Sequence, residues 1–184
     1  QIFNSPEKGT QLRTWIDEID SYTKDPEIDG MIIDMGHVRA HFSKRGEIYD
    51  AFMRFKDADK TIYVYANKGI SNSDYLLVSM ADEIYLNEYT GVDLRGLRLK
   101  VTFFRSLLDT LLIVPEVFRV EHEGKSYKTA ADPFLNNKMS DEMRENYGEL
   151  GDDLYTFFVG AISEGRGWNE SHTMEIIDNG PYAL

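Results

Sequence analysis

An alternation of helical and extended patterns along the first half of the chain most strongly constrains its fold. Apolar residues recur at helical spacing over residues 12–22, and the apolar run Gly30–Asp34 follows them. A second helical pattern over residues 48–55 precedes Thr61–Ala66, which is rich in β-branched and aromatic residues. Strands that alternate with helices are typical of a mainly parallel sheet with crossover helices. We therefore predict an α/β fold.

The alternation continues with shorter elements that turn signals separate. We predict helices over residues 74–81 and 104–111, and strands over residues 84–86, 92–94 and 116–120. Ligands gather at the carboxyl ends of parallel strands. A functional site is therefore expected in the loops that begin at Gly36, Asn67 and Glu121.

A long C-terminal helix is predicted after Ser140, which can serve as the N-cap before two acidic residues. Apolar residues keep helical period from there to Ile162. Gly148, Gly151 and Gly160 fall inside this helix, and each glycine costs about 1 kcal/mol relative to alanine. We expect packing against a second subunit or domain to offset that cost.

Size and charge limit the classes of protein and partner. The 184 residues fit one α/β domain over residues 1–184, and the start at Gln1 and the apolar end suggest truncation at both ends. With 20 basic and 32 acidic residues, the formal charge is −12, which disfavours nucleic acid as a partner. No apolar run approaches the roughly 20 residues of a membrane span.

Cofactor and metal motifs are missing from the sequence. There are no cysteines, so disulfides, thiol catalysis and thiolate metal sites are excluded. Of the histidines, His37, His41, His122 and His172, only His37 and His41 are four positions apart, and they lie in a predicted loop rather than on the helix that a zinc motif of the HExxH kind requires. Glycine-rich phosphate-binding patterns are absent as well. We therefore predict neither a cofactor nor a metal.

Lys128 stands on a short tether between a predicted strand and a turn that contains Pro133. Serine hydrolases can use lysine as the base, provided that the amine is neutral. The ordinary pKa of a lysine is about 10.4, so a dry pocket is needed, whereas nearby Glu121, Glu123 and Asp132 would oppose neutrality. The spacing of these residues alone does not decide whether Lys128 is a catalytic base or a solvated surface charge.

Three blocks of sequence, residues 66–86, 91–97 and 124–142, together resemble the signal peptide peptidase A (protease IV) family. These are membrane-bound serine/lysine peptidases with a crotonase/ClpP-like fold. The third block is the most specific, because Tyr127-Lys128-Thr129-Ala130 is similar to the lysine motif of the family. The resemblance implies that Lys128 is the general base.

The first block departs from the family at the nucleophile position. Counting back from Tyr75, that position holds Asn72, and Ser71 and Ser73 are one residue out of register. Gly36 is a single glycine where catalytic repeats have a pair beside the oxyanion hole. The chain thus resembles the N-terminal repeat of the long form, which supplies the lysine while a C-terminal repeat supplies the serine. The isolated chain is expected to be inactive, with Lys128 solvated.

The resemblance implies the lysine-contributing half of an endopeptidase that degrades cleaved signal peptides or other short hydrophobic peptides. It also implies a homo-oligomer, a tetramer in the family, on the extracytoplasmic side of the bacterial inner membrane. An alternative is a non-catalytic scaffold or oligomerisation domain of the same fold, in which Lys128 pairs with Glu121 or Asp132. A crotonase-like acyl-CoA enzyme is a third, weaker interpretation.

Overall fold

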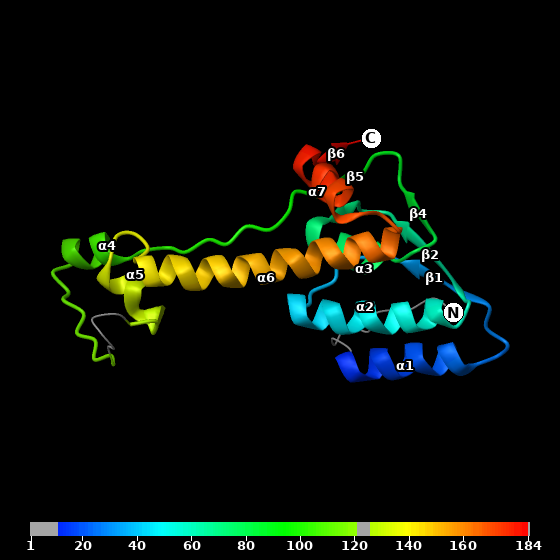
Figure 1. The fold of residues 1–184 in the computed structure, drawn as a ribbon, viewed down its shortest axis with the longest axis horizontal. Coiled ribbons are helices and arrows are strands. Elements are labelled where there is room, and N and C mark those ends of the chain that lie inside the picture. Colours follow the sequence, from blue (N-terminus) through cyan, green and yellow to red (C-terminus); the bar gives the residue numbers. More distant parts are fainter. Residues whose placement is uncertain (1–10, 121–125, 184) are drawn as a thin grey trace. The chain divides into compact units, whose positions relative to one another are not determined.

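The computed structural model describes residues 11–120 and 126–183, and the chain divides into two compact units (Figure 1). The first unit comprises Gln1–Gly96 and Phe157–Leu184, and the second comprises Leu97–Thr156. That residues 1–184 form one domain, the first repeat of a longer protein, stays a prediction.

A three-stranded parallel sheet forms the centre of the first unit. Its strands are β1 (Gly30–Asp34), β2 (Thr61–Ala66) and β4 (Glu83–Leu86), in the order β1-β2-β4. Helix α2 (Phe42–Asp57) connects β1 to β2, and α3 (Asn72–Val78) lies between β2 and β4 in the chain. The predicted α/β class, with a parallel sheet and crossover helices, is confirmed.

A second, smaller sheet fixes the segment that precedes α3. Strand β3 (Ile70–Ser71) pairs in parallel with β5 (Gly91–Asp93), and β5 pairs antiparallel with β6 (Tyr182–Ala183). The pairing with β5 therefore holds the segment before α3 in place, and β6 in turn pairs with β5. The turn into α3 corresponds to the strand-to-helix elbow where the family resemblance puts the nucleophile position.

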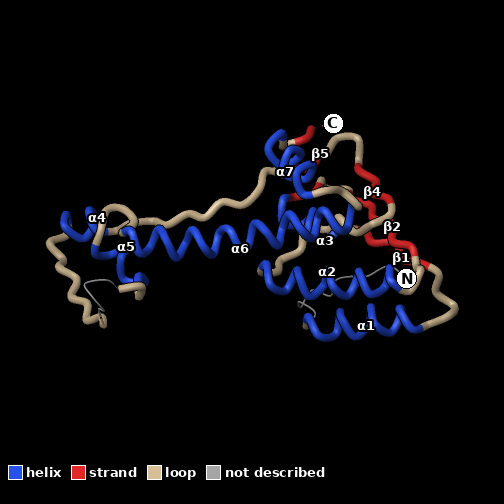
Figure 2. Tube along the Cα trace, in the orientation of Figure 1, coloured by secondary structure: helices blue, strands red, loops and turns tan. Residues whose placement is uncertain are grey.

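The core of the first unit forms because one face of the sheet is covered by helices. Along β2, the buried residues Ile62, Val64 and Ala66 alternate with exposed ones, as expected for a strand with one covered face. Helix α1 (Leu12–Lys24) packs against α2, beside which it lies (Figure 2). The fully buried large side chains of this unit are Ile19, Phe55, Ile62, Val64, Leu76, Val78, Met80, Leu94, Phe158, Val159 and Ile162.

The long C-terminal helix is confirmed as α6 (Asp141–Arg166), followed by α7 (Glu170–Asn179). The Ser140 hydroxyl accepts a hydrogen bond from the backbone N–H of Met143 at 3.2 Å, which confirms Ser140 as its N-cap. Among the helices of the described residues, none is both long and apolar enough to cross a membrane.

The second unit contains short helices and the first part of α6. These are α4 (Arg105–Thr110), the 3-10 helix η1 (Thr129–Ala131) and α5 (Asp132–Leu135). The rings of Phe104 and Phe134 stack with centroids 5.7 Å apart, and the Phe104 N–H donates to the Pro133 carbonyl at 2.7 Å. These contacts hold α4 against α5.

The predicted helix over residues 104–111 is present as α4, although it buries none of its residues. One expectation for the second unit is wrong, because residues 116–120 do not form the predicted strand. Phe118 is 96% exposed and Val120 is 78% exposed. The pattern of these residues suits a strand, but a strand also needs a paired neighbour, and the described part of this unit contains no strand.

Gly165 is the glycine of α6 at which an added methyl group would meet backbone. A Cβ there would lie 2.8 Å from the Met80 nitrogen, whereas at Gly160 it would meet nothing within 4 Å. We expect Gly165→Ala to lower the free energy of unfolding by about 1–3 kcal/mol through overpacking. Gly160→Ala, the control, should raise it by up to about 1 kcal/mol. Urea unfolding compares the two, and equal effects would contradict this packing.

Candidate functional site

The backbone around Lys128 is anchored, while the Lys128 side chain is exposed, as expected. Lys128 directly precedes η1. The carbonyl of Tyr127 accepts a hydrogen bond from Asn146 Nδ2 at 3.1 Å, and the Tyr127 hydroxyl donates to Glu145 Oε2 at 2.8 Å. On the other side of Lys128, the side chain of Thr129 is buried. The lysine is thus presented to solvent from a fixed backbone.

Asp132 provides the second anchor of this segment. Its side chain is fully buried; Oδ1 accepts from Arg119 Nη1 at 3.1 Å and Oδ2 accepts from the hydroxyl of Ser140. Both carboxylate oxygens are therefore engaged by partners other than Lys128. Within residues 11–120 and 126–183, Lys128 has no ion pair, and the alternative partner Glu121 lies outside the described residues.

Asn72, which the family resemblance puts at the nucleophile position, is the first residue of α3, and its amide holds a neighbouring loop. Asn72 Oδ1 accepts from the backbone N–H groups of Arg95 at 3.0 Å and Gly96 at 3.2 Å. Its Nδ2 donates to the Gly96 carbonyl at 2.7 Å. The nucleophile position of this chain therefore has a structural role.

The serines that flank Asn72 are engaged as well. The Ser71 hydroxyl donates to Asp74 Oδ2 at 2.6 Å and caps α3 by accepting from the Asp74 N–H at 3.3 Å. The Ser73 carbonyl accepts from Arg45 Nη1 at 3.0 Å. Neither serine has a histidine or lysine as a hydrogen-bond partner in the described structure, so neither is arranged as an activated nucleophile.

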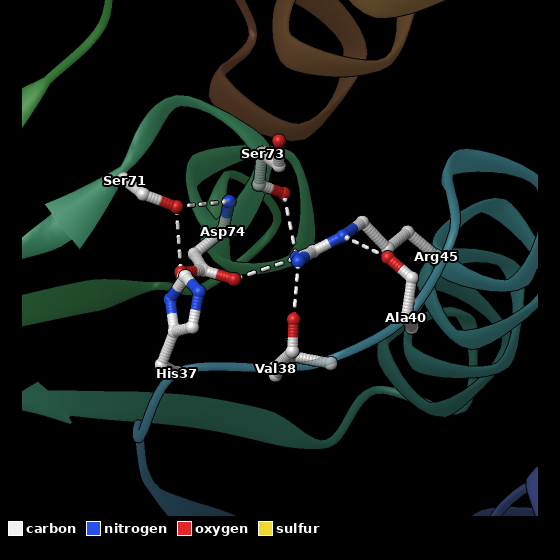
Figure 3. A network of polar contacts seen from close by, with 7 residues as sticks. All are labelled: His37, Val38, Ala40, Arg45, Ser71, Ser73 and Asp74. Carbon is white, nitrogen blue, oxygen red and sulfur yellow. Dashed lines mark hydrogen bonds and ion pairs between the residues drawn. The ribbon is translucent and has the colours of Figure 1, made fainter.

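A buried ion pair between Arg45 and Asp74 organises this elbow (Figure 3). Arg45 Nη1 lies 2.6 Å from Asp74 Oδ1, and the two side chains are only 5% and 4% exposed. Arg45 also donates through Nε to the Ala40 carbonyl at 3.1 Å, and through Nη2 to the Val38 carbonyl. One guanidinium therefore fixes both the loop after β1 and the start of α3.

His37 completes the network. Its Nδ1 lies 2.9 Å from Asp74 Oδ2, and its side chain is 68% exposed. Burial by itself would raise the pKa of Asp74, but hydrogen bonds from Ser71 and Arg45, and the charges of Arg45 and His37, outweigh it. The pKa of Asp74 is lowered, which keeps this carboxylate ionised.

Two pockets meet at His37. One, of about 370 Å³, is mainly apolar and includes Trp15, Ile33, Met35, Val38 and Phe52 in its lining. The other, of about 230 Å³, is lined by His37, Lys68, Gly69, Ile70, Ser71, Asp74 and Asp93. The loops that begin at Gly36 and Asn67 thus line one pocket together, and a functional site there stays a prediction. Glu121 lies outside the described residues.

The sequence did not reveal the network around Asp74. Ser71 and Asp74 have capping-box spacing, which was the available signal. Nothing local marked Arg45 or His37 as their partners. Across the described residues, no three His, Asp or Glu side chains gather closely enough to hold a metal ion.

The lowered pKa of Asp74 gives a pH prediction. In the folded chain this pKa lies below its ordinary value of 3.8, so the carboxylate stabilises the fold above about pH 4. That contribution is lost as pH falls through the folded-state value. We expect the difference in unfolding free energy between wild type and Asp74→Asn to shrink from pH 6 to pH 3. A difference that is constant over this range in urea unfolding would contradict the assignment.

Comparison with known proteins is consistent with the motif around Lys128. The chain is 37% identical over 143 residues to "Protease 4" of Haemophilus influenzae, an alignment that covers 77% of this chain and 22% of that protein. It is 25% identical over 160 residues to "Serine protease SPPA, chloroplastic" of Arabidopsis thaliana, which covers 87% of this chain and 23% of that protein. The chain thus spans about a quarter of the length of these relatives.

Among solved structures, the chain is similar to an enoyl-CoA hydratase/isomerase family protein from Silicibacter pomeroyi, with a TM-score of 0.39 and 11% identity. That match covers 90% of this chain and 83% of the other. The strand pairings of the chain itself define its fold class. The model of peptidase family S49 matches residues 54–183, which include both the elbow at Asn72 and the segment of Lys128. The chain belongs to peptidase family S49.

Proposed function

We propose that this chain contributes the general base of a serine/lysine endopeptidase, and that Lys128 is that base. The nucleophilic serine would come from a C-terminal repeat of a longer protein. Membership of peptidase family S49 supports a peptidase. The relatives are about four times as long as this chain, which leaves room for a second segment that supplies the serine.

The observation that carries the proposal is the use of Asn72 as a structural clamp. An amide cannot attack a carbonyl carbon, and the Asn72 amide is already bonded to the backbone of Arg95 and Gly96. The lysine motif, in contrast, is complete, and its backbone is held on both sides of Lys128. If one repeat supplies the base and another repeat supplies the serine, the first repeat has a lysine and no nucleophile, as this chain does.

In the proposed mechanism, neutral Lys128 accepts the proton of the serine hydroxyl while the serine oxygen attacks the peptide carbonyl carbon. The tetrahedral intermediate collapses, the peptide C–N bond breaks, and the leaving amine takes the proton from Lys128. Lys128 then accepts a proton from water while the water oxygen bonds to the acyl carbon. The bond from that carbon to the serine oxygen breaks, and Lys128 returns the proton to the serine. Removal from water or a neighbouring positive charge favours the neutral form of a lysine, and we propose that the second repeat activates the exposed Lys128 side chain by covering it.

The substrates that we propose are cleaved signal peptides or other short hydrophobic peptides in extended form. The setting that we propose is a homo-oligomer at the extracytoplasmic face of the bacterial inner membrane. The names "Protease 4" and "Serine protease SPPA" of the relatives support the peptidase class. The net charge of −12 supports a peptide rather than a nucleic acid as ligand.

Active-site labelling in the full protein tests where the nucleophile lies. A fluorophosphonate probe reacts with an activated serine, and peptide mass spectrometry then locates the modified residue. We expect the label on a serine outside residues 1–184. Label on Ser71 or Ser73 would contradict the proposal, because it would put the nucleophile in this chain. Failure of any serine to react would favour the alternative of a non-catalytic scaffold or oligomerisation domain.

A further inference from the structure

We propose that His37 and Asp74 form a proton-transfer dyad that hydrolyses esters of short apolar acids, without the use of Lys128. The dyad lies at the elbow of the first unit, where His37 borders both pockets. This activity is additional to the proposed peptidase half-site. Its chemistry follows from the hydrogen bonds of His37 and from the character of the two pockets.

The contact with Asp74 fixes the tautomer of His37. A carboxylate can only accept hydrogen bonds, so the Nδ1 atom, 2.9 Å from Asp74 Oδ2, carries the proton of the neutral ring. The lone pair is then on Nε2. The side chain is 68% exposed, and no group in the described part of the chain bonds to Nε2. His37 therefore offers an oriented base to solvent, as the histidine of a Ser-His-Asp triad does.

Asp74 is rigidly held for this task. Arg45 and Ser71 bond its two oxygens, and its side chain is 4% exposed. A buried, ionised carboxylate against Nδ1 stabilises the imidazolium that forms when Nε2 takes a proton. Figure 3 shows His37 reaching Asp74 from the loop after β1, while Ser71 reaches it from the end of β3, directly before α3.

The pockets select the substrate class. The 370 Å³ pocket is apolar around Ile33 and Val38, which suits a short acyl chain. Lys68 is among the residues that line the 230 Å³ pocket, and the charge of a lysine at such a site can stabilise an oxyanion. The carboxylate of Asp93 in that pocket is paired with Arg95, so it does not cancel Lys68 directly. An ester of a short apolar acid fits the two pockets, with its acyl chain in the apolar pocket and its carbonyl group in the polar one.

Water is the nucleophile in this reaction. His37 Nε2 accepts a proton from water while the water oxygen bonds to the ester carbonyl carbon. The tetrahedral intermediate then collapses, the bond from carbon to the alcohol oxygen breaks, and the imidazolium returns its proton to the leaving alkoxide. One ester and one water give one acid and one alcohol, and no other reactant is consumed.

Hydrolysis of 4-nitrophenyl hexanoate by the 184-residue chain tests the proposal. The reaction is followed until many molecules of ester are hydrolysed per molecule of protein, because acylation of lysines consumes each lysine only once. We expect turnover above the uncatalysed rate, with kcat/KM about tenfold higher for the hexanoate than for the acetate. His37→Ala should lower kcat/KM for the hexanoate by about 100-fold. The exposed His37 side chain is not part of the core, so the variant should fold normally, and circular dichroism checks this.

His41→Ala is the matched control, because His41 is in the same loop but outside both pockets, and its activity should equal wild type. Asp74→Asn should lower kcat with little change in KM, and should have no further effect in the His37→Ala background. Absence of turnover in the wild type, or equal rates for wild type and His37→Ala, would overturn the proposal. An Asp74→Asn effect that persists without His37 would overturn the role of Asp74.

Discussion

Replacing Lys128 by alanine in the full protein is expected to lower kcat/KM for a hydrophobic peptide substrate by about 10³-fold. General-base catalysis contributes about 10²–10⁴-fold, and a serine hydroxyl without a base is a weak nucleophile. The variant should fold normally, since the Lys128 side chain is exposed and its segment is held by Asn146 and Asp132 instead.

Two matched variants sharpen this test. Lys138→Ala removes an exposed lysine of the same unit and should leave kcat/KM unchanged. Lys128→Arg keeps the charge, but a guanidinium stays protonated at all working pH values, so it should be as inactive as the alanine variant. Activity in Lys128→Arg would mean that the charge of Lys128 matters rather than its basicity. Unchanged activity in Lys128→Ala would refute the base assignment.

The second large effect is expected at the buried ion pair of the elbow. Arg45→Ala should lower the free energy of unfolding by about 3–5 kcal/mol, because it leaves the Asp74 carboxylate buried without its cation. The carbonyls of Val38, Ala40 and Ser73 also lose their donor. Urea unfolding at neutral pH measures the change.

Arg54→Ala is the control for this experiment. Arg54 is on the same helix, α2, but its partner Asp20 is near the surface, and the two side chains are 48% and 32% exposed. Exposed ion pairs contribute about 0–1 kcal/mol, so the control should lose little stability. If Arg45→Ala and Arg54→Ala have equal effects, the ion pair does not organise the elbow.

Local periodicity was sufficient to predict much of the fold. Strands β1 and β2 have the predicted bounds, because each is a short apolar run between turn signals. The start of α6 was marked by the capping side chain of Ser140. The strand predicted over residues 116–120 is wrong, since strand formation depends on a partner that local sequence does not reveal.

One part of the candidate site could be predicted from the sequence, and the other part could not. Lys128 and Asn72 could be assigned because each falls in a short motif of the family. The network of His37, Arg45 and Asp74 could not be predicted, since Asp74 follows Arg45 by 29 positions and His37 by 37. Its contacts arise from the way that the loop after β1 meets the elbow, which is set by the pairing of strands.

The rate of serine acylation most directly tests the claim that Lys128 activates a serine outside this chain. In the full protein, stopped-flow fluorescence would follow acylation by a fluorophosphonate in wild type, Lys128→Ala and Lys138→Ala. The account predicts that Lys128→Ala lowers this rate by about 100-fold or more, while Lys138→Ala has no effect. An acylation rate in Lys128→Ala equal to that of wild type would contradict it.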